Sequence, residues 1–266
     1  MTSKNLPSPA AVGPVLASVT CPMGLVRVTV DPAATIARAE VRTDDTTGPA
    51  ADAVAKSRIS QDGNRLTIVV PEVEGAGGGI TQTVITRGGR TTVTQTIGTV
   101  YGSVTGMTIR NGRIVTGGGN GVVSSGIEVL VTLPAGSGVQ MSSTNADLEV
   151  TGLLAALDLS TRNGSLTAGV IGRVKVRGHN GDSEIASVQE RADIETHNGN
   201  TYIGNYGGGA ARVVTHNGNV DLAAGPTASG QIEARAHNGN IRLRGVSHRP
   251  ELKVVTRTHN GHVSKH

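Results

Sequence analysis

Five histidines recur at near-constant spacing in the second half of the chain, each directly before an Asn-Gly pair. They are His179, His197, His216, His237 and His259. Imidazole is the commonest metal ligand in proteins and the side chain whose charge changes near neutral pH. This histidine column therefore has three interpretations. It is a metal site, a pH-sensing surface on which neighbouring imidazoles titrate together, or a structural row that stacks beside a turn.

Other residues that could carry catalysis do not gather into a known motif. The sequence has no GxSxG nucleophile elbow, no Walker loop and no HExxH zinc motif. No Cys or carboxylate shares the histidine column, whereas a structural zinc needs four converging ligands. We therefore expect no cofactor and no enzymatic activity, with a β-helix enzyme acting on polysaccharides as an alternative.

The histidines belong to a longer repeat that is marked by asparagine. The repeated asparagines are Asn145, Asn163, Asn180, Asn198, Asn217, Asn238 and Asn260, which gives steps of 18, 17, 18, 19, 21 and 22 residues. All but the first are followed by a glycine, namely Gly164, Gly181, Gly199, Gly218, Gly239 and Gly261. A period near 20 with a fixed turn dipeptide is typical of coiled repeat architectures.

Apolar residues alternate on both sides of each asparagine. In the fourth repeat, Ala192 and Ile194 precede Asn198, and Thr201 and Ile203 follow it. Alternation with period two predicts two short strands per repeat with one buried face. Asn-Gly supplies two residues that tolerate positive φ, so we expect a tight turn between the strands. If the asparagine side chains point inward, they form a hydrogen-bonded ladder.

These patterns predict an all-β fold, a single elongated β-solenoid with coils of about 17–22 residues, because like positions then stack about 4.8 Å apart. A β-sandwich is the alternative. Five residues before each asparagine, the charges alternate in sign between consecutive coils, as cross-strand pairing favours. The members of this row are Gln140, Asp158, Lys175, Asp193, Arg212, Glu233 and Val255. Three residues before the asparagines, we expect Arg177 to lie opposite Glu195 of the next coil, but Arg235 to lie opposite Arg257.

The rest of the chain divides into two further segments. Residues 1–74 hold N-terminal strands and capping coils, residues 75–126 are a Gly/Thr-rich insertion, and residues 127–266 carry the repeats. Strands are expected at 25–30, 36–41, 66–70 and 127–133, a turn at Asp62-Gly63 and a short helix at 51–56. Lys265 occupies a position that is apolar or small in the other repeats, and its charge discourages a further coil.

The insertion is nearly mirror-symmetric about two turn dipeptides. One is Gly88-Gly89, where Arg87 faces Arg90, and the other is Asn111-Gly112. We predict β-hairpins at 80–97 and 107–116. They are either a surface excursion or an assembly arm, since low charge and high β-propensity favour strand addition from another chain.

Composition limits the classes of partner. The 266 residues carry a net charge of +4, with Lys and Arg interleaved with Asp and Glu, and contain three Tyr but no Phe or Trp. Without a basic run or an aromatic platform, we expect no nucleic-acid binding. The single cysteine, Cys21, excludes an internal disulfide. Without a secretory or membrane-spanning stretch, we expect a cytoplasmic protein with no membrane span.

Several segments, in this order, resemble a bacterial family of β-strand-repeat proteins of unknown function, often labelled adhesins. They are strands 25–30 and 36–41, Asn64-Arg-Leu-Thr-Ile-Val-Val-Pro71, residues 127–136 and Thr196-His-Asn-Gly-Asn-Thr-Tyr-Ile-Gly204. The resemblance implies a β-solenoid without established catalytic activity, and some relatives are linked to cell-envelope stress signalling. The histidines, the insertion and the lack of a membrane anchor depart from the family pattern.

We therefore predict a non-enzymatic β-solenoid that serves as a scaffold or protein-interaction module. Self-association through the 75–126 hairpins is one route to such a role, because unpaired strand edges add strands readily. The alternative is an adhesin on a cell or virion surface that binds glycans, although the scarcity of aromatic side chains disfavours sugar stacking.

Overall fold

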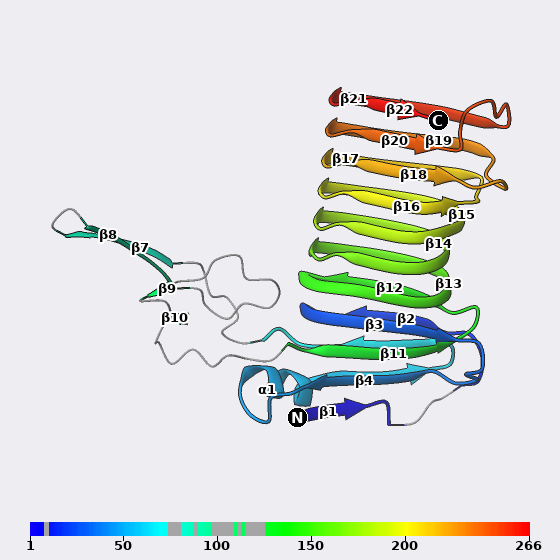
Figure 1. The fold of residues 1–266 in the computed structure, drawn as a ribbon. Coiled ribbons are helices and arrows are strands. Elements are labelled where there is room, and N and C mark those ends of the chain that lie inside the picture. The colour runs from blue at the N-terminus through cyan, green and yellow to red at the C-terminus, as the bar shows by residue number, and fades with distance from the viewer. Residues whose placement is uncertain (8–10, 74–80, 88–89, 97–108, 111–112, 115–125) are drawn as a thin grey trace.

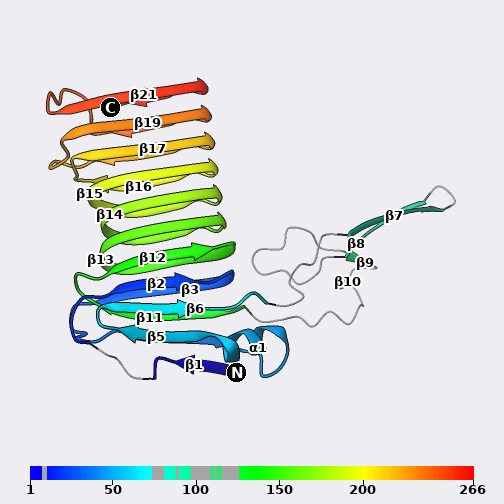
Figure 2. The same ribbon diagram turned by 180° about the vertical axis from the view of Figure 1, so that it is seen from behind.

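In a computed structural model, the described residues are 1–7, 11–73, 81–87, 90–96, 109–110, 113–114 and 126–266. Eighteen strands of this part belong to one continuous hydrogen-bonded sheet, which winds into a stack of thin coils (Figure 1). The predicted β-solenoid is confirmed. Seen from behind, the stack shows the same single column of coils with the two chain ends at opposite ends of the column (Figure 2).

The repeat region forms most of the column. Its strands are β12 (Gly138–Ser143), β13 (Asn145–Asn163), β14 (Leu166–Asn180), β15 (Ser183–Asn198), β16 (Thr201–Tyr206), β17 (Ala210–Asn217), β18 (Val220–Ala224), β19 (Gly230–Asn238), β20 (Ile241–Arg244), β21 (Leu252–Asn260) and β22 (Val263–Lys265). Neighbouring coils pair in parallel, with Asn180 opposite Asn198 and Asn198 opposite Asn217. This parallel pairing excludes a meander of hairpins in the repeats.

The core is a narrow stack of aliphatic side chains inside the coils. Ile185, Ile203, Leu222 and Leu243 are fully buried and lie at matching positions of consecutive coils. Each such side chain contributes about 1.5–3 kcal/mol by leaving water. The space between the two walls of a coil is thin, so that Ala, Val, Ile and Leu fill it with little need for aromatic rings.

The N-terminal segment closes one end of the column. Its elements are β1 (Thr2–Asn5), β2 (Leu16–Thr20), β3 (Met23–Asp31), β4 (Arg38–Thr43), α1 (Pro49–Lys56), β5 (Arg58–Asp62) and β6 (Arg65–Val69). Strand β11 (Glu128–Pro134) pairs in parallel with β3 but antiparallel with β4. Strand β1 then adds antiparallel to β4, and α1 packs beside both. The change of direction ends the solenoid and covers its first coils.

The N-terminal segment is also woven into the repeat region. Strands β2 and β3 pair in parallel with β12 and β13, so the N-terminal strands and the repeat strands share one sheet. The helix expected at 51–56 lies within α1. The turn between β5 and β6 falls on Gly63 and Asn64, one residue later than expected, because Asp62 still pairs with Arg65.

Two short hairpins of the insertion fall partly within the described residues. Strand β7 (Thr81–Arg87) pairs antiparallel with β8 (Arg90–Thr96), with Arg87 opposite Arg90. Strand β9 (Ile109–Arg110) pairs in the same way with β10 (Arg113–Ile114). The turn residues Gly88, Gly89, Asn111 and Gly112 lie outside the described residues.

The C-terminal coil ends at an exposed lysine. Lys265 in β22 pairs with Leu243 of the coil before it, and its side chain is exposed. Within the described residues, α1 is the one helix, and its eight residues are too few and too polar to cross a membrane.

Candidate functional site

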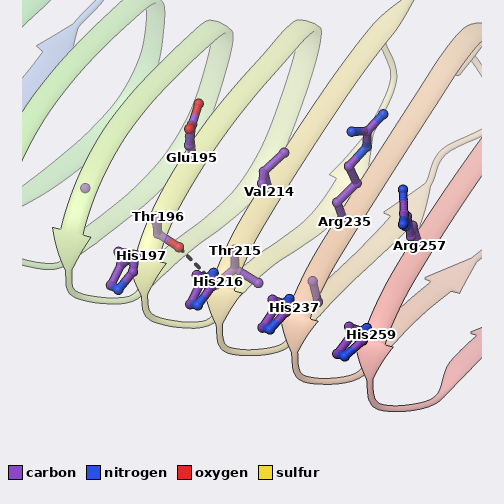
Figure 3. Close-up of a pocket in the computed structure, with 12 residues that line it drawn as sticks. Glu195, Thr196, His197, Val214, Thr215, His216, Arg235, His237, Arg257 and His259 are labelled. Atoms are coloured by element: carbon purple, nitrogen blue, oxygen red, sulfur yellow. Dashed lines mark hydrogen bonds between the residues drawn. The ribbon is translucent and has the colours of Figure 1, made fainter.

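The histidine column is a stack of parallel imidazoles on the outside of the solenoid (Figure 3). Ring centroids of consecutive histidines lie 4.6–4.8 Å apart, and their planes differ by 1–6°. Each ring comes from the last residues of a strand, directly before the asparagine that pairs with its copy in the next coil. The spacing is therefore set by the backbone, and the ring faces are covered by their neighbours.

The repeated asparagines form a hydrogen-bonded ladder beside the histidine column. In each step, the side-chain Nδ2 donates to the Oδ1 of the asparagine one coil earlier, over 2.6–2.8 Å. The ladder runs without interruption from Asn145 to Asn260. An asparagine in the middle of the stack both donates and accepts, so the ladder fixes the register of the coils.

The glycines after the asparagines are required by close packing between coils. A Cβ atom on Gly199 would lie 2.0 Å from the carbonyl oxygen of Gly181, and one on Gly218 would lie 2.0 Å from that of Gly199. The expected turn with two positive φ values is wrong. Among the described residues, His248 is the one non-glycine with positive φ, so the asparagines keep ordinary backbone angles. At five corners the glycine alone takes a positive φ, namely at Gly181, Gly199, Gly218, Gly239 and Gly261.

A second ladder is formed by the residues two positions after the asparagines. It was not predicted from the sequence. Here a side-chain oxygen accepts the backbone N–H of the matching residue in the next coil, as Asp182 Oδ1 does from Asn200 N at 2.7 Å. The same contact recurs in four other steps, which join Asp147 to Ser165, Asn200 to Asn219, Asn219 to Asn240, and Asn240 to His262. The Asp or Asn that follows Gly in most repeats was the available signal.

The charged rows stack as the sequence predicts, but their ion pairs also cross between rows. Lys175 pairs with Asp158 at 3.2 Å, whereas Asp193 binds Arg177 at 3.0 Å and Arg212 at 3.4 Å. The hydrogen bond from Arg177, with the nearby guanidinium charges, lowers the pKa of the Asp193 carboxyl against the opposing effect of burial. The arrangement neutralises this part of the surface.

A shallow groove runs along the column axis between the histidine column and the row three residues before the asparagines (Figure 3). It has a volume of about 570 Å³. Its far wall, the outer row, consists of Glu195, Val214, Arg235 and Arg257, and its near wall of His197, His216, His237 and His259. The floor is made by residues that turn inward between the two walls, including the buried Thr196, Thr215 and Ala236.

The charge of the groove changes along its length. At one end, Glu195 lies 3.3 Å from Arg212 and 3.8 Å from Arg177. At the other end, Arg235 and Arg257 are backbone partners on adjacent coils. Arg235 binds Glu233 at 2.5 Å, whereas Arg257 has no ion-pair partner in the part of the chain that the structure describes. The groove is therefore most positive beside His237 and His259.

The family model described as Toastrack DUF4097 matches residues 50–266. The chain belongs to this family. Comparison with solved structures finds three that are similar to different degrees. A putative adhesin from Bacteroides fragilis is 13% identical, with a TM-score of 0.56, and the match covers 99% of this chain and 96% of that one.

Two further structures are less similar. A putative adhesin from Parabacteroides distasonis gives 12% identity, a TM-score of 0.46 and coverage of 100% and 96%. A putative cell adhesion protein from Clostridium sporogenes gives 8% identity, a TM-score of 0.38 and coverage of 99% and 98%. A comparison with curated proteins gives no match. The first likeness supports the Toastrack fold, and none of them assigns an activity to this chain.

The histidine column of this Toastrack protein has a geometry that does not favour metal chelation. A ring nitrogen directs its lone pair within the ring plane, so parallel rings direct their lone pairs side by side instead of toward a common point. In the described part of the chain, no group of three or more His, Cys, Asp or Glu side chains converges as a metal site would require. Chelation of zinc would require the stack to open.

Protonation of the column is opposed at its centre. Partial desolvation lowers the pKa of His216, and the charges of His237 and His197 lower it further. All five rings are exposed. The neighbouring rings of this Toastrack protein therefore oppose the protonation of His216.

Proposed function

We propose that this Toastrack protein is a non-enzymatic interaction module that binds an extended ligand along the groove. The observation that carries the proposal is the linear repetition of the groove. Four consecutive coils contribute one imidazole each to one wall and one outer-row residue each to the other. Such a surface presents an imidazole at every coil, which suits a ligand that is itself extended.

The arrangement of polar groups also supports a binding role over catalysis. An active site brings a nucleophile, a base and an electrophile stabiliser to one point. Here the asparagines and the second ladder are occupied by hydrogen bonds between coils, as in the bond from Asn198 to Asn180. The histidine rings contact one another in place of a carboxylate or a hydroxyl. A binding role agrees with the adhesin names of structures that share the fold.

The experiment is a binding array of polysaccharides, peptides and single-stranded nucleic acids. It compares the native protein with a groove variant, Arg235→Gln/Arg257→Gln, and with a control that loses two exposed charges elsewhere, Arg58→Gln/Arg65→Gln. We expect at least one extended ligand to bind the native protein and the control but not the groove variant. Binding of no ligand, or equal binding by all three proteins, would contradict the proposal.

Self-association through the insertion is a second candidate function. Among the described strands, β7 pairs with β8 alone, and the hairpin is a two-stranded sheet with an unpaired edge on either side. Such edges favour strand addition. Light scattering on the native chain and on a chain lacking residues 75–126 tests it. We expect the native chain to form an oligomer and the shortened chain to be a monomer. The same number of chains per particle in both proteins would exclude this role.

A further inference from the structure

We propose that the positive end of the groove is a binding site for a linear acidic polysaccharide, which is gripped by Arg235 and Arg257 on one wall and by His216, His237 and His259 on the other. This inference rests on the proposed function, since it names the ligand class of the same groove. Carboxylate or sulfate groups on consecutive sugars would face one wall or the other along the column axis.

The charge pattern of the outer row is the first argument. Arg177 and Glu195, which lie opposite each other on adjacent coils, neutralise one another within the protein. Arg235 and Arg257 repeat the same position with like charge, a destabilising arrangement on a sheet surface, and Glu233 pairs with Arg235 but leaves Arg257 without an anion among the described residues. Arg257 keeps all five of its donors for an outside group in the described structure, and planar guanidinium groups bind carboxylates with two parallel hydrogen bonds.

The spacing of the two walls is the second argument. Imidazoles follow each other every 4.6–4.8 Å along the groove. An extended polysaccharide with one acidic group per sugar advances by about one pyranose ring per charge, which is similar to one coil. An extended peptide advances about 3.3 Å per residue, so its side chains on one face lie about 6.6 Å apart and lose step with the coils. A sugar polymer stays in register over several contacts.

The orientation of the rings distinguishes a polysaccharide from a nucleic acid. Proteins that bind single strands stack bases on the faces of aromatic rings. In this column each inner ring has both faces covered by its neighbours, with interplanar angles of 4–6° around His216 and His237. The exposed edges offer N–H donors instead. Edge donors bind carboxylate and hydroxyl oxygens, which acidic sugars present in abundance.

The same walls make the binding pH-dependent. The charged and titratable groups on the strands around the imidazoles are those of both walls and of the adjoining turns, namely Arg177, Glu195, Arg235, Arg257, Glu233, Asp182 and His262. Protonation of His216 as the pH falls makes the groove more positive. An acidic polymer offsets this added charge, so its affinity rises as the pH falls.

The test is isothermal titration calorimetry with oligomeric polygalacturonate at pH 7.5 and pH 5.5. Its fully methyl-esterified form serves as a neutral ligand of the same backbone. Native protein is compared with Arg235→Gln/Arg257→Gln, with the histidine variant His216→Gln and with the distant control Arg58→Gln/Arg65→Gln, after circular dichroism shows that each variant is folded. We expect at least tenfold weaker binding to the arginine variant, less than twofold change in the control and tighter binding at pH 5.5 that the histidine variant loses. The ester should not bind.

Each remaining outcome decides between this inference and the broader proposal. Absence of saturable polygalacturonate binding, or equal binding of the ester, would overturn the acidic polysaccharide as ligand. If a polyglutamate or a single-stranded DNA binds in an Arg235- and Arg257-dependent manner instead, the ligand class is wrong and the groove function stands. If polygalacturonate binds all variants equally, its site lies elsewhere, and both the inference and the groove function fail.

Discussion

Asn198 donates a hydrogen bond from its side-chain amide to the Oδ1 of Asn180, 2.8 Å away, while the two residues are also backbone partners on adjacent coils. The side chain and the backbone therefore specify the same register. Because a histidine directly precedes the last five asparagines of the ladder, the ladder also sets the spacing of the imidazoles and of the outer row. The groove depends on this register.

Removal of one rung should weaken the column. Asn198→Ala loses the bond to Asn180 and also leaves Asn217 Nδ2, which donates to Asn198 at 2.7 Å, without its acceptor. We expect a loss of about 1–3 kcal/mol in the free energy of unfolding, measured by urea denaturation. Asn64→Ala, in the exposed turn between β5 and β6, should cost less than half as much. Equal costs would show that the ladder does not stabilise the coils.

The corner glycines should tolerate substitution far less than other glycines. Gly199→Ala places a Cβ 2.0 Å from a backbone carbonyl oxygen of the preceding coil, which forces the coils apart. We expect destabilisation above about 4 kcal/mol, or failure to fold. The matched control is Gly209→Ala, where a Cβ meets nothing within 4 Å and the change should stay within about 1 kcal/mol. A thermal melt of Gly199→Ala that resembles the control would contradict the close stacking.

These two substitutions also show how far the sequence predicts the structure. The near-constant step from asparagine to asparagine predicts the solenoid, the inward and outward faces and the rows of charge. Each coil places its residues over the equivalent residues of the coil before it. The local sequence does not predict the backbone conformation of the corners. Asn-Gly suits a hairpin turn as well as a solenoid corner, and the approach of Gly181 O to Gly199 decides between them. That contact exists only once the coils are stacked.

The remaining differences have the same origin in long-range contacts. The antiparallel cap depends on pairing Thr2 with Thr43, which no local pattern encodes. Asp193 binds Arg177 because a guanidinium reaches across two rows, whereas the row pattern alone pairs Asp193 with Lys175. The groove lies between the histidine column and the outer row, with inward-turned residues as its floor. It forms only when the stacked coils place these two rows side by side.

Acidification should destabilise the free protein through the histidine column. The pKa of His216 is lowered in the folded state, so the unfolded chain binds a proton more readily. The contribution of His216 to the free energy of unfolding is complete above the unfolded pKa of about 6.5. It is lost as the pH falls through the lower pKa of the folded state. We expect Tm to fall between pH 8 and pH 5 in the native protein and to fall less in His216→Gln. A Tm that rises on acidification would contradict the lowered pKa of His216.

The buried cysteine should be unreactive until the chain unfolds. Cys21 is fully buried, and desolvation raises the pKa of its thiol to about 12; the thiol donates a hydrogen bond to Met23 O at 3.1 Å. Iodoacetamide at pH 8.5 should leave the native protein unlabelled and label it completely in 6 M urea, as followed by mass spectrometry. The raised pKa also means that its contribution to stability is present below the unfolded value of about 8.5 and is lost as the pH rises toward 12. Rapid labelling of the native state would show that the first coils open.

The claim that the groove binds the ligand is tested most directly by NMR of the imidazoles. Protein carrying isotope-labelled histidine is titrated with tetragalacturonate at pH 6. Resonances of His216, His237 and His259 should shift together and saturate, while that of His248, outside the groove, should stay unchanged. Shifts confined to His248, or no shift in any ring at saturating ligand, would contradict the account.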